Sequence, residues 1–337
     1  MRTSTAAIAS SRNMASAERS PGAAGDSLDR ERLNPLLARR DRPGLVRFGL
    51  QALVFVGAST ATASLAARDS PFALAAAILA GLALLTFFPA LHEAGHGTAF
   101  RTPWLNTAVQ WIAAVAMLQS PKFFQEFHFE HHRRTQDPER DPEIDAAPGQ
   151  LDDWPRNLAV YLALASGQHL LVGKLAFTAG WALLPRAVLE RFFPFVPDRA
   201  RARVVWESRG VLGILGTGCL VGLILLPGFP AVLLAWPIAH VLLGFYLMPE
   251  HTGLPHTGTQ CARTRSVESN AAVRWLMWNM PFHAVHHAQP GVPFHAVPAL
   301  HRLFAARLEH VTAGYLAFHR EGLRRALRPR PRTAAPR

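Results

Sequence analysis

The pattern of polar and apolar positions divides the chain into long uncharged stretches separated by charged segments. Residues 48–67 and 70–92 contain no Asp, Glu, Lys or Arg, and residues 210–249 are uncharged around a central Pro-Gly-Phe-Pro turn at 227–230. Because a bilayer core requires about 20 apolar helical residues, this pattern predicts four membrane-spanning helices. We expect them at residues 46–67, 71–91, 209–226 and 231–249. The short connections predict two helical hairpins, so the expected fold class is an all-α integral membrane protein.

Two further apolar stretches, residues 104–118 and 157–184, fit this pattern less well. The first is too short to span a bilayer easily, and the second contains Lys174 and several polar residues. If both hairpins enter from the same side, an even number of crossings must separate residues 92 and 209. We therefore interpret both stretches as interfacial or re-entrant helices. A cramped pair of crossings within 157–184 is the alternative.

Composition changes the picture by excluding several protein classes. Hydrophobic residues make up 50% of the 337 positions and charged residues 17%, whereas about a quarter of a soluble chain is charged. This excludes a disordered chain and disfavours an ordinary cytosolic globule. The two cysteines, Cys219 and Cys261, form no CxxC pair. They cannot build a disulfide framework, a zinc ribbon or a fused iron–sulfur module.

The distribution of the positive charge predicts how the chain is oriented. The net charge is +12, and all but two of the 35 basic residues are arginines. This bias fits a GC-rich bacterial genome, so we expect the protein in a bacterial cytoplasmic membrane. The two expected hairpin turns contain a single arginine, whereas the termini and residues 93–209 contain the others. By the positive-inside rule, both termini and the central segment should be cytoplasmic. We expect the basic tail after about residue 320 to lie beside anionic lipid, and we expect no nucleic-acid partner.

These observations predict that the chain is divided into three segments. Residues 1–43 lack the apolar core of a secretory signal and predict a disordered cytoplasmic arm. Residues 44–319 should form the membrane domain, in which a cytoplasmic helical cap carries the polar chemistry. Residues 320–337 predict a basic disordered tail.

Clustered histidines are the strongest chemical signal in the chain. Of the 16 histidines, eight lie in the sequences HEAGH at 92–96, HFEHH at 128–132 and HAVHH at 283–287. Random placement rarely produces one HxxHH sequence and almost never two. On a helix, positions i, i+3 and i+4 share one face, so each cluster can direct two or three imidazoles to a common point.

The number of imidazoles indicates two metal ions. Imidazole binds iron, zinc, copper and nickel, and tetrahedral zinc takes about four ligands, so eight histidines exceed the need of one ion. His251 follows the last expected span and is a ninth candidate, and His256 is the alternative for that position. An all-imidazole iron pair could activate dioxygen and oxidise an unactivated C–H bond. A site at the membrane face would give a lipid chain direct access.

These boxes resemble those of the integral-membrane fatty acid desaturases and hydroxylases, which carry HxxxH, HxxHH and HxxHH around two membrane hairpins. The resemblance covers roughly residues 45–305 in order and spacing, including the third-box region Trp278–His295. It implies a di-iron site, dioxygen as co-substrate, a lipid substrate and an external electron donor. By resemblance, the metal ligands are His92, His96, His128, His131, His132, His283, His286 and His287, with His251 as the additional histidine.

The chain contains neither a haem-binding HPGG segment nor a CxxC pair for rubredoxin-type iron. We therefore expect electrons from a separate ferredoxin-like or small haem cytochrome partner. Such donors are generally acidic, and an arginine-rich cytoplasmic face would attract one.

Alternative functions remain open on sequence alone. Desaturation of a fatty acyl chain is the preferred activity, and hydroxylation or ketolation of an acyl, sphingoid or carotenoid lipid is the second. HEAGH also matches the HExxH motif of zinc proteases, in which Glu93 would be the general base. A histidine-rich metal transporter or sensor is a further alternative, although transporters tend to place ionisable ligands within their spans.

The remaining histidines are assigned smaller roles. We expect His240 to be a buried hydrogen-bonding group and His169 a core residue. His295 and His301 should pack locally or support ligands, and His310 and His319 should be exposed.

Several other polar residues near the boxes have two interpretations. We interpret the charged run at 137–143 as a helix stop with solvated charges rather than as carboxylates that orient imidazoles. Glu93 and Glu130 are candidate partners of the box histidines. Asn279 is interpreted as a turn or helix residue and Cys219 as an unreactive apolar one.

Overall fold

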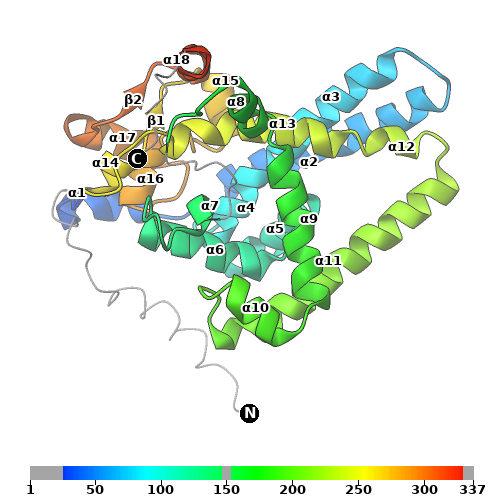
Figure 1. Ribbon diagram of the computed structural model, residues 1–337, viewed down its shortest axis with the longest axis horizontal. Helices are drawn as coiled ribbons and strands as arrows, with labels where there is room; N and C mark the ends of the chain where they lie inside the picture. The colour runs from blue at the N-terminus through cyan, green and yellow to red at the C-terminus, as the bar shows by residue number, and fades with distance from the viewer. Residues whose placement is uncertain (1–25, 146–152, 329–337) are drawn as a thin grey trace, which may run out of the picture.

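The fold is given by a computed structural model, which describes residues 26–145 and 153–328 (Figure 1). Helices dominate the described chain, as the sequence predicts. Its strands are a parallel pair, β1 (Ser266–Val267) and β2 (Val311–Thr312). The all-α fold class is therefore confirmed.

Four helical stretches are long and apolar enough to cross a membrane, which confirms the number predicted from the sequence. The first is α2 (Asp41–Ala66), and the second joins α3 (Phe72–Leu85) to α4 (Phe87–Gly95). The third is α11 (Asp198–Leu225), and the fourth joins α12 (Phe229–Val232) to α13 (Ala235–His251). Helix α11 begins earlier than predicted, because its charged first turns continue the same helix.

The apolar stretch at 157–184 forms two helices that meet at an angle. Helix α8 (Leu158–Ala165) and helix α9 (Gln168–Leu183) are bent by 56°, the form of a broken span or a re-entrant segment. Between them lies Gly167, whose φ of +61° places it in the left-handed region that glycine tolerates best. The other apolar stretch, at 104–118, forms α5 (Pro103–Ala116), which packs on α4 and α6.

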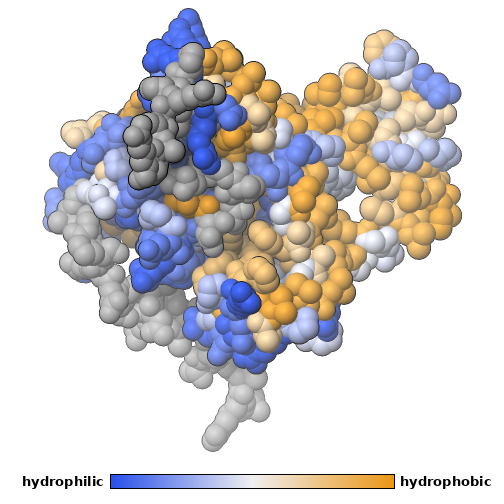
Figure 2. Space-filling model, viewed as in Figure 1, coloured by the Kyte–Doolittle hydropathy of each residue, from blue (hydrophilic) through white to orange (hydrophobic). Residues whose placement is uncertain are grey.

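Large apolar side chains cover the outer faces of the candidate spans. Leu53 of α2, Phe72 of α3 and Ile224 of α11 are 68–70% exposed. The space-filling view shows the same hydrophobic surface as broad orange areas over the helices at its right side (Figure 2). Single exposed apolar residues are ordinary, but contiguous apolar surface of this kind marks a contact with lipid. The chain is thus an integral membrane protein.

The packing partners of the spans differ between the two halves. Helices α2 and α3 pack against each other, and α13 also packs on α3. Helix α11 instead packs on α9, and Figure 1 shows α11 and the α12–α13 stretch meeting at their turn and diverging from it. Helix α9 lies between these two diverging stretches and contacts both.

Short helices gather at one end of the spans, and they contribute most of the site described below. They are α6 (Pro121–Arg134), α7 (Pro142–Asp145), α10 (Arg186–Phe192), α14 (Gln260–Arg263), α15 (Ala271–Leu276), α16 (His283–Ala288), α17 (Val297–Phe304) and η3 (Ala305–Arg307). A buried cluster that includes Leu91, Phe100, Trp278 and Phe294 packs this region against the spans.

The prediction of disordered ends is wrong where the structure describes them. Residues 30–37 of the expected arm form α1 (Arg30–Leu33) and η2 (Asn34–Leu37), because Leu33 and Leu36 pack on a buried cluster around α16 and α17. Helix α18 (Tyr315–Leu327) extends into the expected tail, because Phe318 is buried in another cluster. The rest of both ends, residues 1–25 and 329–337, lies outside the described residues.

Candidate metal centre

Helix α4 and its end position the first histidine box. His92 lies one turn before the end of α4, and His96 is the residue that follows its last turn. Gly97, with φ of +68°, then turns the chain away from the helix axis. The i, i+4 spacing keeps both imidazoles on one face, and His92 is 1% exposed.

Helix α6 positions the second box and is anchored at its start. Ser120 caps the helix by accepting a hydrogen bond from the Phe123 amide. The Glu207 carboxylate of α11 accepts hydrogen bonds from the Ser120 hydroxyl and the Lys122 amide. The anchored helix directs its three histidines, His128, His131 and His132, toward α4 and α16.

The third box and the end of α13 complete the site. All three histidines of α16 are buried. His251 is the last residue of α13 and is also buried, and its Nδ1 lies 3.1 Å from the Arg263 carbonyl oxygen. His256, the sequence-based alternative, is exposed, and its Nδ1 lies 2.8 Å from the Gln136 carbonyl oxygen. His251, not His256, therefore joins the box histidines.

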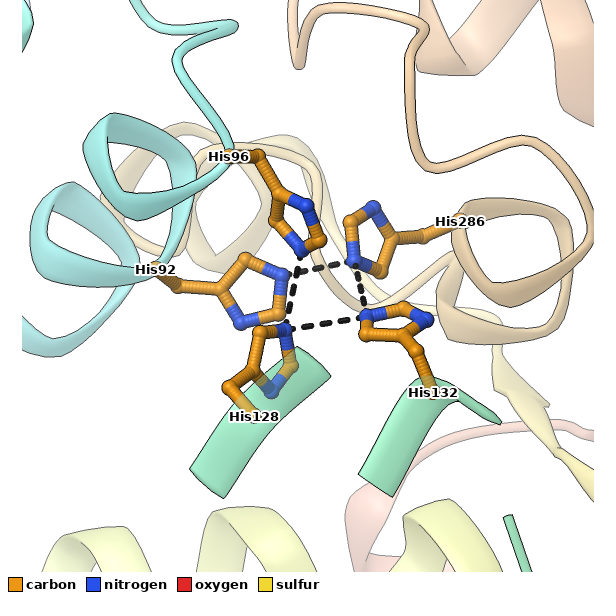
Figure 3. A group of neighbouring side chains, drawn as sticks. All are labelled: His92, His96, His128, His132 and His286. Atoms are coloured by element: carbon orange, nitrogen blue, oxygen red, sulfur yellow. Dashed lines mark hydrogen bonds between the residues drawn. The ribbon is translucent and has the colours of Figure 1, made fainter. Parts of the chain in front are cut away.

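The nine histidines form two compact groups. Each residue of a group offers one ligand atom within 4.8 Å of the others. The first group contains five histidines from α4, α6 and α16, shown in Figure 3: His92, His96, His128, His132 and His286. The second contains four from α6, α13 and α16: His131, His251, His283 and His287.

Within the first group the Nε2 atoms face one another. The Nε2–Nε2 distances are 2.7 Å for His92–His286 and 2.9 Å for both His96–His128 and His128–His132. The fourth contact, between His132 and His286, is 3.2 Å, and Figure 3 shows the five imidazoles turned toward one another with these contacts between them. Three chain segments far apart in sequence thus meet through their imidazoles.

The second group has the same arrangement. The Nε2 atom of His287 lies 3.0 Å from that of His283 and 3.3 Å from that of His131. The His251 ring lies 4.8–5.3 Å from the rings of the other three. His128 and His131 share α6, and His286 and His287 are neighbours on α16, so the two groups adjoin.

These distances fit ligands of a common ion. Nitrogens bound at about 2.1 Å to one ion lie about 3.0 Å apart when their bonds are perpendicular. Without an ion, each Nε2–Nε2 contact would need a proton on one of its two nitrogens and a lone pair on the other. The His251 Nε2 atom has no hydrogen-bond partner among the described residues although it is buried. It is a lone-pair donor directed into the second group.

Hydrogen bonds at Nδ1 fix the tautomers of three of the four histidines in the second group, whereas the buried His283 Nδ1 has no partner among the described residues. His131 Nδ1 donates to Asp141 at 2.9 Å, and His251 Nδ1 donates to the Arg263 carbonyl. His287 Nδ1 lies 3.2 Å from the Thr135 hydroxyl, which itself donates to the His131 carbonyl. Each bond places the proton on Nδ1 and leaves the Nε2 lone pair for a metal ion.

Burial also favours the neutral, ligating form of most of these histidines. It lowers the pKa of His128, His132, His283, His286 and His287 well below the ordinary value, and that of His96 to about 3. His131 differs. Burial lowers its pKa too, but the Asp141 and Glu143 carboxylates outweigh that effect and raise it to about 9.

The interpretation of residues 137–143 as a solvated charge run is wrong for Asp141. This residue is 1% exposed and contacts His131 Nδ1 through both carboxylate oxygens, at 2.9 and 3.1 Å. It also accepts a hydrogen bond from the Gln136 amide. Glu143 contributes a weaker contact, 3.6 Å from His131 Nδ1. The chain folds back here because Gln136 adopts a φ of +63°.

Other predicted supporting residues have different partners. The Glu93 carboxylate accepts a hydrogen bond from Thr98, and Glu130 pairs with Arg133. Neither residue belongs to the two histidine groups. Asn279 adopts a φ of +62° and donates to the Phe294 carbonyl, which confirms its turn role. Thr135, which supports His287, was missed because a threonine after a histidine box carries no signal of its own.

The histidines outside the groups follow expectation in part, and His310, which was expected to be exposed, is half-buried. His240 is buried, and its Nδ1 lies 2.8 Å from the Trp236 carbonyl. His301 stacks on Phe282. His169 is only partly buried and lines a cavity rather than the core. The prediction that His319 is exposed is wrong, because its ring is 5% exposed and stacks on Phe245.

A cavity of about 160 Å³ adjoins both groups and extends between α6, α9 and α13. Histidines of both groups line it: His92, His128, His131, His251 and His283. Most of its other walls are apolar: Phe88, Phe123, Phe124, Phe127, Ile144, Leu170, Phe177, Leu243, Leu247, Met248 and Met280. Lys174 also lines the cavity, and its Nζ lies 3.4 Å from His240 Nε2.

A search of curated proteins finds no match. A family model described as fatty acid desaturase matches residues 69–319. This match contains all nine clustered histidines and most of the described helices. Taken with the two histidine groups, the match shows that the chain belongs to the fatty acid desaturase family.

Proposed function

We propose that this protein desaturates a fatty acyl chain in the membrane, using dioxygen and a pair of iron ions. The family and the two histidine groups fit a di-iron oxidoreductase of the desaturase and hydroxylase kind. The observation that carries the proposal is the convergence of nine histidines, from four chain segments, into two adjoining groups.

The nine histidines are the proposed ligands, five for one ion and four for the other. When bound, an iron pair supplies the dioxygen-dependent oxidation of an unactivated C–H bond. The role of the chain is to hold nine imidazole Nε2 atoms in place before the metal arrives. Asp141 and Thr135 would support this by fixing the tautomers of His131 and His287.

The cavity would bind the acyl chain and position it for reaction. Its phenylalanine and leucine side chains exclude water and favour an apolar ligand. Because His92 and His283 line the same cavity, a bound chain would pass beside both groups. Holding a chain rigidly there would make the step between the chain and the reacting centre effectively unimolecular.

Hydroxylation or ketolation is the alternative chemistry, because it begins with the same removal of hydrogen. Mass spectrometry of lipids from an expressing host with a matching reductase distinguishes the two. A new double bond appears as a loss of two hydrogens and a hydroxyl group as a gain of one oxygen. Unchanged lipids in every class would contradict both activities.

Metal analysis tests the site directly. We expect about two irons per purified chain, and we expect His286→Ala and His251→Ala each to reduce iron content together with activity. His256→Ala is the matched control, because this exposed histidine lies outside both groups. A zinc protease would retain its zinc in the His286→Ala variant, so that outcome would contradict the proposal.

We propose that a separate ferredoxin-like or small haem cytochrome delivers the electrons. Support comes from the arginines at the end of the molecule that carries the site, among them the exposed Arg133, Arg134 and Arg140. Electrostatic attraction of an acidic donor predicts turnover that falls steeply as salt is raised from about 50 to 500 mM. Turnover that is independent of salt would contradict this steering.

We further propose that both termini and the histidine groups face the cytoplasm of a bacterial cell. The proposal is supported by the concentration of arginines in the termini and in residues 93–209.

A further inference from the structure

A carboxylate lies beside the second histidine group with no role in the site described so far. Glu250 precedes His251 at the end of α13 and is 6% exposed. Its Oε2 atom lies 3.4 Å from the Nε2 atom of His283. Its Oε1 atom is buried without a hydrogen-bond partner among the described residues.

The surrounding protein does not balance the charge of this carboxylate. In the part of the chain that the structure describes, no lysine or arginine forms an ion pair with Glu250. The Arg265 guanidinium donates instead to the backbone carbonyls of Pro249 and Thr252, which lie on either side of Glu250 in the sequence. An ionised carboxylate buried without a partner is strongly disfavoured, so a cation bound beside it would remove that penalty.

The other buried carboxylates near the site are already used. Asp141 accepts hydrogen bonds from His131 Nδ1 and the Gln136 amide, on the side of the ring away from the ligand nitrogen. Glu93 accepts from the Thr98 hydroxyl. Glu250 instead faces an Nε2 atom, and so lies on the side of the second group where the lone pairs converge.

The two groups also differ by one donor. The first contains five imidazoles and the second four. We propose that Glu250 is an oxygen ligand of the ion held by His131, His251, His283 and His287. The proposal rests on the proposed di-metal site. It makes the two ions chemically unequal, one bound by nitrogen alone and one by nitrogen and a carboxylate oxygen, a donor that iron accepts readily.

Glu250→Gln tests the assignment because it keeps the shape of the side chain and removes its charge. We expect the full-length protein, purified without metal and titrated with Fe²⁺, to bind the second ion at least 10-fold more weakly. Mössbauer spectra of ⁵⁷Fe-loaded protein should show that one of the two wild-type iron signals shifts or is lost. Glu93→Gln is the matched control, because it removes a buried carboxylate that hydrogen bonds to Thr98.

Two results would overturn the proposal. One is a Glu250→Gln protein that binds both irons with wild-type affinity and an unchanged Mössbauer spectrum. The other is an equal loss of iron in the Glu93→Gln control, which would point to a general effect of buried charge. Failure of the proposed di-metal site is distinguishable, because wild-type protein would then bind fewer than two irons. Failure of desaturation alone would leave both wild-type irons and the effect of Glu250→Gln in place.

Discussion

At the scale of single residues, the contact between His131 and Asp141 indicates how a histidine would be prepared for a metal ion. The carboxylate holds the Nδ1 proton, so the Nε2 atom points at His287 and the second group. The same contact raises the pKa of His131 to about 9, so without metal this histidine is protonated at neutral pH. An incoming cation would replace that proton.

Asp141→Asn should weaken iron binding at the second group by about 10- to 100-fold, the usual effect of losing a carboxylate that orients a ligating imidazole. The expected result is a titration in which one of two irons binds more weakly. Glu139→Gln is the control, since Glu139 is exposed and two residues away from Asp141. Equal iron affinity in both variants would contradict the assigned role.

The box histidines could be predicted from sequence because their geometry is local. Spacing within one helix keeps the i and i+4 histidines of every box in the same group. The expectation that all three imidazoles of an HxxHH box meet at one point is wrong, because His131 and His286 each belong to the other group. Asp141 could not be predicted, because its position depends on the turn at Gln136, whose φ of +63° has no sequence signature here. The choice between His251 and His256 also required the structure, since it depends on where α13 ends.

At the scale of elements, the bend between α8 and α9 rests on a close approach of two glycines. A Cβ added to Gly167 would lie 1.7 Å from the His240 carbonyl oxygen. A Cβ added to Gly244 of α13 would lie 2.6 Å from the Gly167 Cα. Backbone therefore packs on backbone, and this contact sets how α9 approaches α13 along the cavity.

Gly167→Ala should destabilise the protein by at least about 2 kcal/mol, because alanine resists the left-handed backbone and its Cβ would clash with α13. Thermal unfolding in detergent measures the effect. Gly180→Ala of α9 is the control, since its added Cβ would be in ordinary contact, 3.5 Å from a Leu184 methyl group. Equal melting temperatures for the two variants would contradict the importance of this contact.

The existence of the spans could be predicted from the sequence more accurately than their ends or their packing partners. Hydropathy identifies α2, α3, α11 and α13 because lipid selects for apolar length alone. It could not predict that α11 begins at Asp198, because that extension depends on contacts such as Glu207 with Ser120. The partner of α11 is α9, which hydropathy left as an ambiguous stretch.

At the scale of the whole molecule, two features define a direction across the membrane. One is the exposed apolar surface of α2, α3 and α11, and the other is the end of the molecule that contains the two histidine groups. We predict that a cysteine replacing Arg68, in the turn between α2 and α3, reacts with an impermeant maleimide in intact cells. A cysteine replacing Glu139, near the second box, should react only after lysis. Both substitutions are made in a Cys219→Ala background, which removes the half-buried native cysteine. The other native cysteine, Cys261, is buried and should not react. The opposite labelling pattern would reverse the proposed orientation.

The histidine groups also join parts of the chain that are far apart. His92 and His286, whose Nε2 atoms are 2.7 Å apart, are separated by 194 positions in sequence. Removing metal with a chelator should therefore lower the melting temperature, since an ion at 100 times its dissociation constant adds about 2.7 kcal/mol. An unchanged melting temperature after complete iron removal would contradict this.

The convergence of four segments on two points has a consequence for biogenesis. Helices α4, α6, α13 and α16 reach the site only after nearly the entire membrane domain has been synthesised. Iron would then act as a late crosslink, comparable to a disulfide that closes a loop of almost two hundred residues. Cells starved of iron should accordingly accumulate an inserted but protease-sensitive protein, whose cleavage sites disappear when the metal is restored.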